Sequence, residues 1–208
     1  MKIVMTTLED ELGRAERCAE QAIENAGVDV SPIISVNEEG EGYVRGTNKA
    51  LAQVEDGEYF CLLNNDSYPE TDNWLAILLD EMKKREEALN VWFAGPSGGC
   101  RTAPQNHGRL GDNRRPKLVR HLAGFCMLCH PDMLAKVGML DDRYIHYAGE
   151  IDWQWRATRD YDAQALWVPE VYVSHQVHPP HQEWWAGDHK VINEVWKWST
   201  GKMTRHPS

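Results

Sequence analysis

Residues 59–69 read YFCLLNNDSYP, an unbroken aromatic and apolar run followed by polar residues and turn formers. Such a run is typical of a strand buried on both faces of a sheet. The run ends at Asn64, Asn65 and Asp66, and open α/β sheets bind their ligands at the carboxyl ends of the strands. We therefore expect Asp66 to face a ligand or a metal ion. A simple turn is the alternative, because Asn, Asp, Ser and Pro also favour turns.

Strand-like and helix-like segments alternate over the first 96 residues. The patterns predict strands over residues 2–7, 28–36, 59–63 and 91–94, with helical segments between them. This alternation indicates an α/β protein with a central, mainly parallel sheet that is flanked by helices on both faces. A chain of 208 residues suits a single domain.

The character of the chain changes after Pro96. Residues 97–116 are rich in Gly, Pro, Asn and Arg and show no periodicity, and a loop of this length inside a domain is usually functional or mobile. Residues 118–128 are again strand-like, and residues 150–159 are helical. Residues 165–173 form a last strand that Pro169 interrupts, which predicts an edge strand. A helix near the carboxyl end follows.

The charge of the chain limits its partners. The formal net charge is −10, so the protein is a poor general binder of nucleic acids or anionic membranes. One segment departs from this trend: residues 101–121 contain six Lys and Arg residues and one acid, Asp112. That local excess suits phosphate groups, and a solvated loop is the alternative.

The compartment is predicted from what the sequence lacks. Five scattered Cys residues do not resemble a disulfide framework. No apolar run reaches the roughly 18 residues of a membrane helix, and the amino-terminal stretch soon becomes acidic, unlike a signal peptide. We therefore expect a cytoplasmic protein without a transmembrane segment.

Two groups of residues could carry chemistry besides Asp66. Glu150 and Asp152 stand at the start of a predicted helix, where one could point into a cleft while the other makes a structural contact. His175 follows the last predicted strand. With Asp66 it could complete a divalent metal site, because imidazole and carboxylate together suit manganese and other transition metals. His178 and His181 are alternatives to His175.

Three blocks of the sequence resemble family 2 glycosyltransferases, which have the GT-A nucleotide-sugar fold. Residues 42–51, GYVRGTNKAL, resemble the family's Gly-aromatic-x-x-Gly-x-Asn-x-Gly-Leu segment. Residues 61–69 resemble the Leu-Asn-x-Asp-x-x-Pro version of its Asp-x-Asp metal motif. Residues 144–156, YIHYAGEIDWQWR, resemble its aromatic-aromatic-x-Tyr-Gly-Glu-Asp-x-Asp-Leu-x-Trp-Arg block, in which Glu150 stands where the family has Asp and Gly149 where it has Glu. The family's Asp-Asn-x-Ser segment is replaced by residues 37–39.

The resemblance implies a single GT-A domain over residues 1–208, with a nucleotide-sugar-binding half at 1–96 and an acceptor-binding half at 97–208. It implies inverting transfer of a sugar from a nucleotide-diphosphate donor to an acceptor hydroxyl, assisted by Mn²⁺ or Mg²⁺ on Asp66 and His175. Glu150 or Asp152 would be the base, with Glu150 preferred. The implied donor-binding residues are Thr6, Thr7, Asn37, Arg45, Asn48, Asn64, Asn65 and Asp66.

The acceptor stays open: a glycan, a lipid-linked sugar, a protein or a modified nucleic acid. Basic side chains of residues 101–120 could close over the pyrophosphate, and Trp153, Trp184 or Trp185 could stack on a sugar ring. Two other functions are alternatives. One is a nucleotidyltransferase acting on sugar phosphates, although residues 6–12 lack a Gly-rich phosphate loop. The other is a non-catalytic module that binds nucleotide sugars or glycans.

Overall fold

The computed structural model describes residues 1–102, 104–176, 179–199 and 202–205, with the backbone alone at 197–199 and 202–205. His178, one of the predicted alternatives for a metal ligand, lies outside these residues. The strands and helices are β1 (Lys2–Leu8), α1 (Leu12–Glu24), β2 (Ser31–Asn37), α2 (Gly42–Leu51), β3 (Phe60–Leu63), β4 (Ser67–Pro69), α3 (Trp74–Leu89), β5 (Val91–Gly98), β6 (Lys117–Val119), β7 (Cys126–Cys129), α4 (Gly149–Tyr161), β8 (Gln164–His175), α5 (Gln182–Val195), β9 (Trp196–Ser199) and β10 (Lys202–Arg205). Short helical turns lie at Glu9–Glu11, Gln105–His107 and Met133–Val137.

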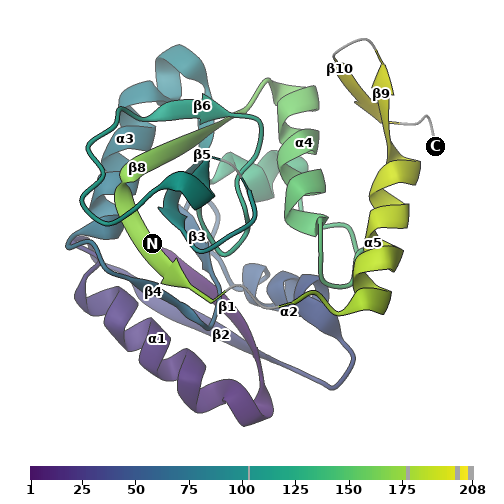
Figure 1. Ribbon diagram of the computed structural model, residues 1–208, viewed down its shortest axis with the longest axis horizontal. Coiled ribbons are helices and arrows are strands. Elements are labelled where there is room, and N and C mark those ends of the chain that lie inside the picture. Colours follow the sequence, from purple (N-terminus) through teal and green to yellow (C-terminus); the bar gives the residue numbers. More distant parts are fainter. Residues whose placement is uncertain (103, 177–178, 200–201, 206–208) are drawn as a thin grey trace.

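An eight-stranded sheet forms the centre of the molecule (Figure 1). Its order is β2-β1-β3-β7-β5-β8-β4, and β6 pairs with β8 beside this path. Strands β1, β2, β3, β5 and β8 run in one direction, while β4, β6 and β7 run against them. The predicted α/β fold with a mainly parallel sheet is therefore confirmed.

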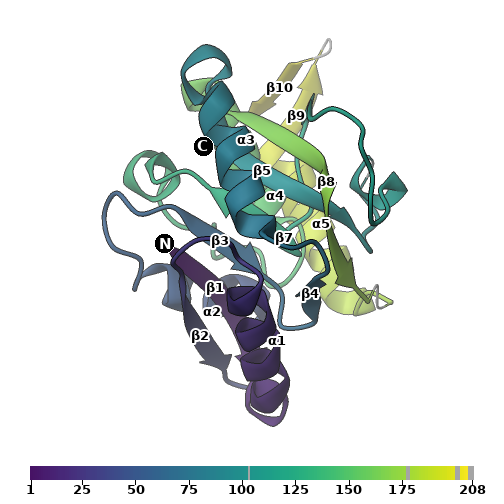
Figure 2. The same ribbon diagram turned by 90° about the vertical axis from the view of Figure 1, so that its left-hand side faces the viewer.

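Helices cover both faces of this sheet, as the view in Figure 2 shows together with Figure 1. Side chains alternate between the faces: in β3, Cys61 and Leu63 join the core under α1 and α3, whereas Phe60 and Leu62 join the core under α2 and α4. All four residues of β3 are buried. A strand covered on both sides has no polar face, which is why its sequence shows an unbroken apolar run.

One expectation about strands was wrong. Strand β8 is not an edge strand, because it pairs with β5 on one side and with β4 and β6 on the other. Its Pro169 is accommodated by an irregularity in the β5–β8 pairing, where the register shifts between Pro96 and Ser97. A bulge removes the need for the amide hydrogen that proline lacks. The strand-like stretch 118–128 contains two short strands, β6 and β7, that pair with different neighbours.

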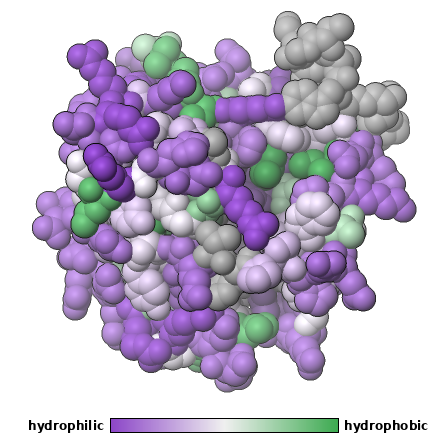
Figure 3. All heavy atoms as spheres, in the orientation of Figure 1, coloured by the Kyte–Doolittle hydropathy of each residue, from purple (hydrophilic) through white to green (hydrophobic). Residues whose placement is uncertain are grey.

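The end of the chain leaves the sheet. Helix α5 runs alongside α4, and the hairpin of β9 and β10 projects from the body of the molecule (Figure 1). The face in Figure 3 is mostly hydrophilic, with small hydrophobic areas separated by polar residues. Among the helices of the described residues, none is both long and apolar enough to cross a lipid bilayer.

Candidate active site at the carboxyl ends of the strands

The polar residues after β3 lie where the sequence predicts them, at the carboxyl end of a buried strand. The side-chain amide of Asn65 donates to the hydroxyl of Thr7 at 2.8 Å and to the carboxylate of Glu11 at 3.0 Å. These bonds connect the end of β3 to the end of β1. Asn64, Asn65 and Asp66 all line a large pocket of about 1000 Å³.

Strand β4 explains how Asp66 meets His175. Ser67 in β4 pairs with His175 in β8, so the residue before Ser67 is brought next to the imidazole ring. The Nε2 atom of His175 lies 3.4 Å from Oδ1 of Asp66 and 3.4 Å from the amide nitrogen of Asn64. Its Nδ1 atom is hydrogen-bonded to the carbonyl of Gly99, and its ring stacks on Phe125.

These residues fit a divalent cation. A histidine that ligates a metal usually gives its other ring nitrogen to a carbonyl or carboxylate, which is the arrangement of His175 and Gly99. Carboxylate oxygen and imidazole nitrogen are ligands for Mn²⁺. In the described part of the chain no third His, Cys, Asp or Glu joins them in a cluster. The protein would therefore supply two such ligands and leave the other positions to the substrate and water, as is common for cations that bind phosphates.

Thr6 and Asn37 form the neighbouring wall of the same pocket. The Thr6 hydroxyl donates to Oδ1 of Asn37 at 2.9 Å, and the Asn37 amide donates to the carbonyl of Gly42 at 2.8 Å. Helix α2 can approach this pair only because residue 46 is glycine. A Cβ atom there would stand 1.8 Å from Oδ1 of Asn37 and 2.2 Å from Oγ1 of Thr6.

The large pocket is acidic. The acidic side chains among its lining residues are Glu9, Asp10, Glu11, Glu39 and Asp66, and no Lys or Arg of the described residues lines it. Glu9, Asp10 and Glu11 belong to the helical turn after β1. An anion can enter such a pocket only with a compensating cation or with a change in protonation.

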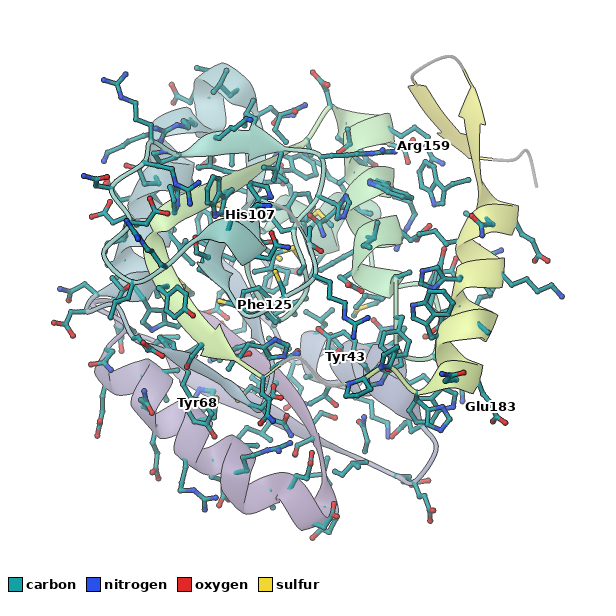
Figure 4. All side chains as sticks on the ribbon, viewed as in Figure 1. Tyr43, Tyr68, His107, Phe125, Arg159 and Glu183 are labelled. Atoms are coloured by element: carbon teal, nitrogen blue, oxygen red, sulfur yellow. The ribbon has the colours of Figure 1, made fainter. Side chains whose placement is uncertain are left out.

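Glu150 lines a second pocket of about 260 Å³. The two pockets share Tyr43, Asn64, His146, Tyr147 and His175, so they are adjacent. Tyr43 and Phe125, labelled in Figure 4, come from α2 and the approach to β7, and both line the second pocket. Desolvation raises the pKa of the Glu150 carboxyl from 4.5 to about 7, although hydrogen bonds from the backbone N–H groups of Glu150 and Gly124 act in the opposite direction.

A buried carboxylate in α5 holds the segment that precedes Glu150. Asp188 is only 1% exposed, and it accepts hydrogen bonds from the backbone N–H groups of Ile145, His146 and Tyr147 at 2.7 to 2.8 Å. The backbone N–H of His181 donates to the hydroxyl of Tyr147 at 2.9 Å. Helix α5 and the residue before it therefore position a segment that lines both pockets.

Three predicted site residues lie outside both pockets. Asp152 is completely buried, and its carboxylate accepts hydrogen bonds from Trp196 at 2.7 Å and from Arg156 at 2.8 Å. Asn48 is bonded to the backbone of Leu140 and to the side chain of Asp142. Arg45 is exposed on α2 and lines neither pocket. Asp152 and Asn48 thus make structural contacts, which the one-dimensional blocks could not distinguish from contacts to a ligand.

The tryptophans predicted as stacking residues also differ in whether they line a pocket. Trp153 is buried in the core and donates from its indole nitrogen to the carbonyl of Gly138. Trp184 lines the large pocket, while Trp185 lines the second pocket and is 44% exposed. His181 is exposed and packs against Trp184, and it lines neither pocket.

Several pocket residues were missed by sequence reasoning. His146 and Tyr147 directly precede the helix that carries Glu150, and that position could have marked them. Burial lowers the pKa of His146, whose ring contacts Tyr43, Tyr147 and Trp184. No local signal marks Asp188, because its partners are 41 to 43 residues away in the sequence.

Comparison with solved structures places this fold among glycosyltransferases. The chain matches GalNAc-T7 with UDP, GalNAc and Mn²⁺ at a TM-score of 0.61 and 13% identity. It matches the catalytic domain of Drosophila beta1,4-galactosyltransferase 7 in complex with xylobiose at a TM-score of 0.57 and 14% identity. It matches S. aureus TarS in complex with UDP at a TM-score of 0.52 and 9% identity. These matches show that the chain has the GT-A glycosyltransferase fold.

The matches cover most of this chain but different shares of the other proteins. The match to GalNAc-T7 covers 86% of this chain and 44% of the GalNAc-T7 chain. The match to the galactosyltransferase covers 95% of this chain and 84% of the other, and the match to TarS covers 93% of this chain and 70% of the other. The chain thus spans less than half of the GalNAc-T7 structure. No protein-family model and no curated protein sequence matches the chain.

Proposed function

We propose that the protein transfers a sugar from a nucleoside-diphosphate donor in the large pocket to an acceptor hydroxyl in the second pocket. One observation carries this proposal. The pocket that contains Asp66 and His175 adjoins the pocket that contains Glu150, and the two share five lining residues. A reacting centre at their junction would meet a cation site on one side and a carboxylate on the other.

The large pocket suits a nucleotide sugar in size and in its polar groups. Its volume of about 1000 Å³ is at the upper end of the range for pockets that enclose drug-sized ligands. Side chains from the ends of three strands provide hydrogen-bonding groups: Thr6 and Thr7 from β1, Asn37 from β2, and Asn64 and Asn65 after β3. The matched structures of GalNAc-T7 and TarS contain UDP, which supports a uridine nucleotide as the first donor to test.

Asp66 and His175 would hold the divalent cation. When bound there, Mn²⁺ or Mg²⁺ would neutralise negative charge on the diphosphate. The acidic lining of the large pocket makes this neutralisation necessary, because no Lys or Arg of the described residues lines it. The Gly99 carbonyl fixes the orientation of the His175 ring, so that Nε2 faces Asp66.

Glu150 would act as the general base. The acceptor oxygen bonds to the anomeric carbon of the donor sugar, the bond from that carbon to the diphosphate breaks, and the diphosphate leaves with the electron pair. The proton of the acceptor hydroxyl passes to Glu150. A pKa of about 7 suits this role, because a base is most effective when its pKa is near the working pH. Attack from the side opposite the diphosphate inverts the anomeric configuration.

The proposal is tested by comparing Glu150→Gln with the unchanged protein and with Glu170→Gln, an exposed glutamate outside both pockets. Nucleotide sugars are first screened by thermal shift with and without Mn²⁺, and the stabilising donor is then offered to pooled acceptors. Glu150→Gln should bind the donor normally and transfer about 10²–10⁴-fold more slowly, while Glu170→Gln should transfer normally.

Two results would contradict the proposal. If Glu150→Gln transfers sugar as fast as the unchanged protein, the base is a different group. If no nucleotide sugar binds with or without a divalent cation, the large pocket is not a donor site. Donor binding without transfer to any acceptor would instead support the non-catalytic module.

A further inference from the structure

The charge of the second pocket differs from that of the large one. The large pocket is lined by five carboxylates, whereas the second pocket has one carboxylate, Glu150, and one permanent cation, Arg101. Of the Lys and Arg residues that the structure describes, only Arg101 lines one of these two pockets, the second. The pocket that contains the proposed base therefore also contains a positive charge, in a protein whose net charge is −10.

Arg101 has no carboxylate partner among the described residues, although this protein has an excess of acids. Two other arginines, one on the same loop and one on α4, differ in this respect. Arg114 binds both carboxylate oxygens of Asp112, and Arg156 binds Asp152. Arg101 is exposed at the pocket, so its guanidinium is available to a ligand. Guanidinium groups bind phosphates and carboxylates through two parallel hydrogen bonds.

The lining of the second pocket is also partly aromatic. Trp185 from α5 is 44% exposed, and its ring stacks on His189 with ring centres 4.0 Å apart. Tyr147 and Phe125 also line this pocket, although Phe125 is only 3% exposed. An aromatic side chain with a large exposed area offers apolar contact to a flat ligand, while its rim can remain wet. Such a surface fits the apolar face of a sugar ring.

We propose that the acceptor is an anionic carbohydrate, whose phosphate or carboxylate group binds Arg101 while its ring lies against Trp185. This inference rests on the proposed function, because it treats the second pocket as the acceptor site. It specifies which acceptors fit: those that have a negative group within the same small pocket as the reacting hydroxyl. A neutral sugar would leave Arg101 without an anion and would gain only the contact with the aromatic side chains.

The experiment uses four probes on the full chain: methyl phosphate, glucose 6-phosphate, glucuronate and glucose. Binding is followed by NMR at the backbone amide of Gly124 and at the indole of Trp185, whose signal is assigned with Trp185→Phe. Methyl phosphate reports the phosphate group alone, and glucuronate separates carboxylate from phosphate recognition. The titrations are run with and without UDP and Mg²⁺, so that an anion in the donor pocket is recognised.

We expect at least one charged probe to shift both signals and glucose to bind at least about tenfold more weakly. Arg101→Ala should reduce the affinity for that probe about tenfold and leave the affinity for UDP with Mg²⁺ unchanged. Arg115→Ala is the matched control, because Arg115 is an exposed arginine of the same loop that lines neither pocket. It should bind all probes normally.

The proposal is overturned if no charged probe shifts these signals, if glucose binds as well as the charged probes, or if Arg101→Ala and Arg115→Ala weaken binding equally. It is also overturned if Arg101→Ala weakens UDP binding and leaves the charged probes unaffected, because Arg101 would then serve the donor. Failure of every nucleotide sugar to bind to the unchanged protein would contradict the proposed function, and the binding of the charged probes could still be measured.

Discussion

The backbone N–H of Tyr147 donates a 2.7 Å hydrogen bond to the carboxylate of Asp188, a residue 41 positions later in the chain. The same carboxylate binds the N–H groups of Ile145 and His146. Helix α5 is thereby attached to the segment that leads into Glu150. The shape of the second pocket depends on a residue that lines neither pocket itself.

Asp188→Ala should destabilise the protein and slow transfer more than it weakens donor binding. It leaves three backbone N–H groups without their charged acceptor, which we expect to cost about 2–4 kcal/mol in the free energy of unfolding. Chemical denaturation and transfer assays would measure the two effects. Glu194→Ala on the same helix is the control. Among the described residues Glu194 makes an exposed contact of 3.9 Å with Lys190, so its loss should change stability by less than about 0.5 kcal/mol. Equal effects of the two substitutions would show that the hydrogen bonds from residues 145–147 to Asp188 contribute little to stability or to transfer.

Transfer should increase as the pH rises through about 7, since Glu150 must be deprotonated to accept a proton and burial raises its pKa to about 7. Stability should follow the opposite trend. The folded state holds this proton more tightly than the unfolded chain, so the contribution is fully present below the ordinary pKa of 4.5 and is lost as the pH rises through about 7. Rates measured from pH 5 to 9 in the unchanged protein would test this, and a flat profile would exclude Glu150 as the base.

Asp152→Asn should damage the fold rather than the chemistry. Asp152 is buried between Arg156 and Trp196, and removing its charge leaves the Arg156 guanidinium without its partner. We expect a loss of about 3–5 kcal/mol in the free energy of unfolding, as for other broken buried pairs. Glu150→Gln, measured beside it, should keep its stability at pH 6 or above. If Asp152→Asn is as stable as the unchanged protein but inactive, Asp152 has a direct part in the reaction.

Asp66→Ala should remove the cation-dependent part of donor binding. Titration calorimetry with UDP should show an affinity that increases with Mn²⁺ in the unchanged protein and no such increase in the variant. We expect a difference of about tenfold or more, because a carboxylate ligand contributes charge as well as a bond. Asp72→Ala, an exposed neighbour outside both pockets, is the control. Retention of the Mn²⁺ effect in Asp66→Ala would move the cation site elsewhere.

Gly46→Ala should separate α2 from the ends of β1 and β2. The added Cβ would overlap the Asn37 and Thr6 side chains, which would break their hydrogen bond. Overpacking of this kind costs about 1–3 kcal/mol, and donor binding should weaken with it. Gly187→Ala in α5 is a sharp control, since a Cβ there meets nothing within 4 Å and alanine favours a helix by about 1 kcal/mol. If Gly46→Ala changes neither stability nor donor binding, α2 can shift to accommodate the added Cβ.

Much of the large pocket could be predicted from the sequence. The buried run of residues 60–63 and the polar residues after it are local features, and a strand covered on both faces must place its end at the ligand edge of an α/β sheet. Of the eight predicted donor-binding residues, Thr6, Thr7, Asn37, Asn64, Asn65 and Asp66 line the large pocket. The fold class follows from the same alternation of strands and helices, because apolar spacing is set by secondary structure.

Only the tertiary structure shows which polar residues of the second half of the chain line a pocket and which are buried in structural contacts. The sequence placed Glu150 and Asp152 on one helix and gave only a preference for Glu150. Their surroundings distinguish them: Glu150 lines a pocket, while Asp152 is enclosed by Arg156 and Trp196. The pairing of β8 with strands on both sides and the hydrogen bonds of Asp188 to the segment before Glu150 also depend on contacts between residues more than 40 positions apart. Local patterns carry periodicity and turn chemistry, whereas which polar group is buried against which partner is set only when distant segments meet in the folded chain.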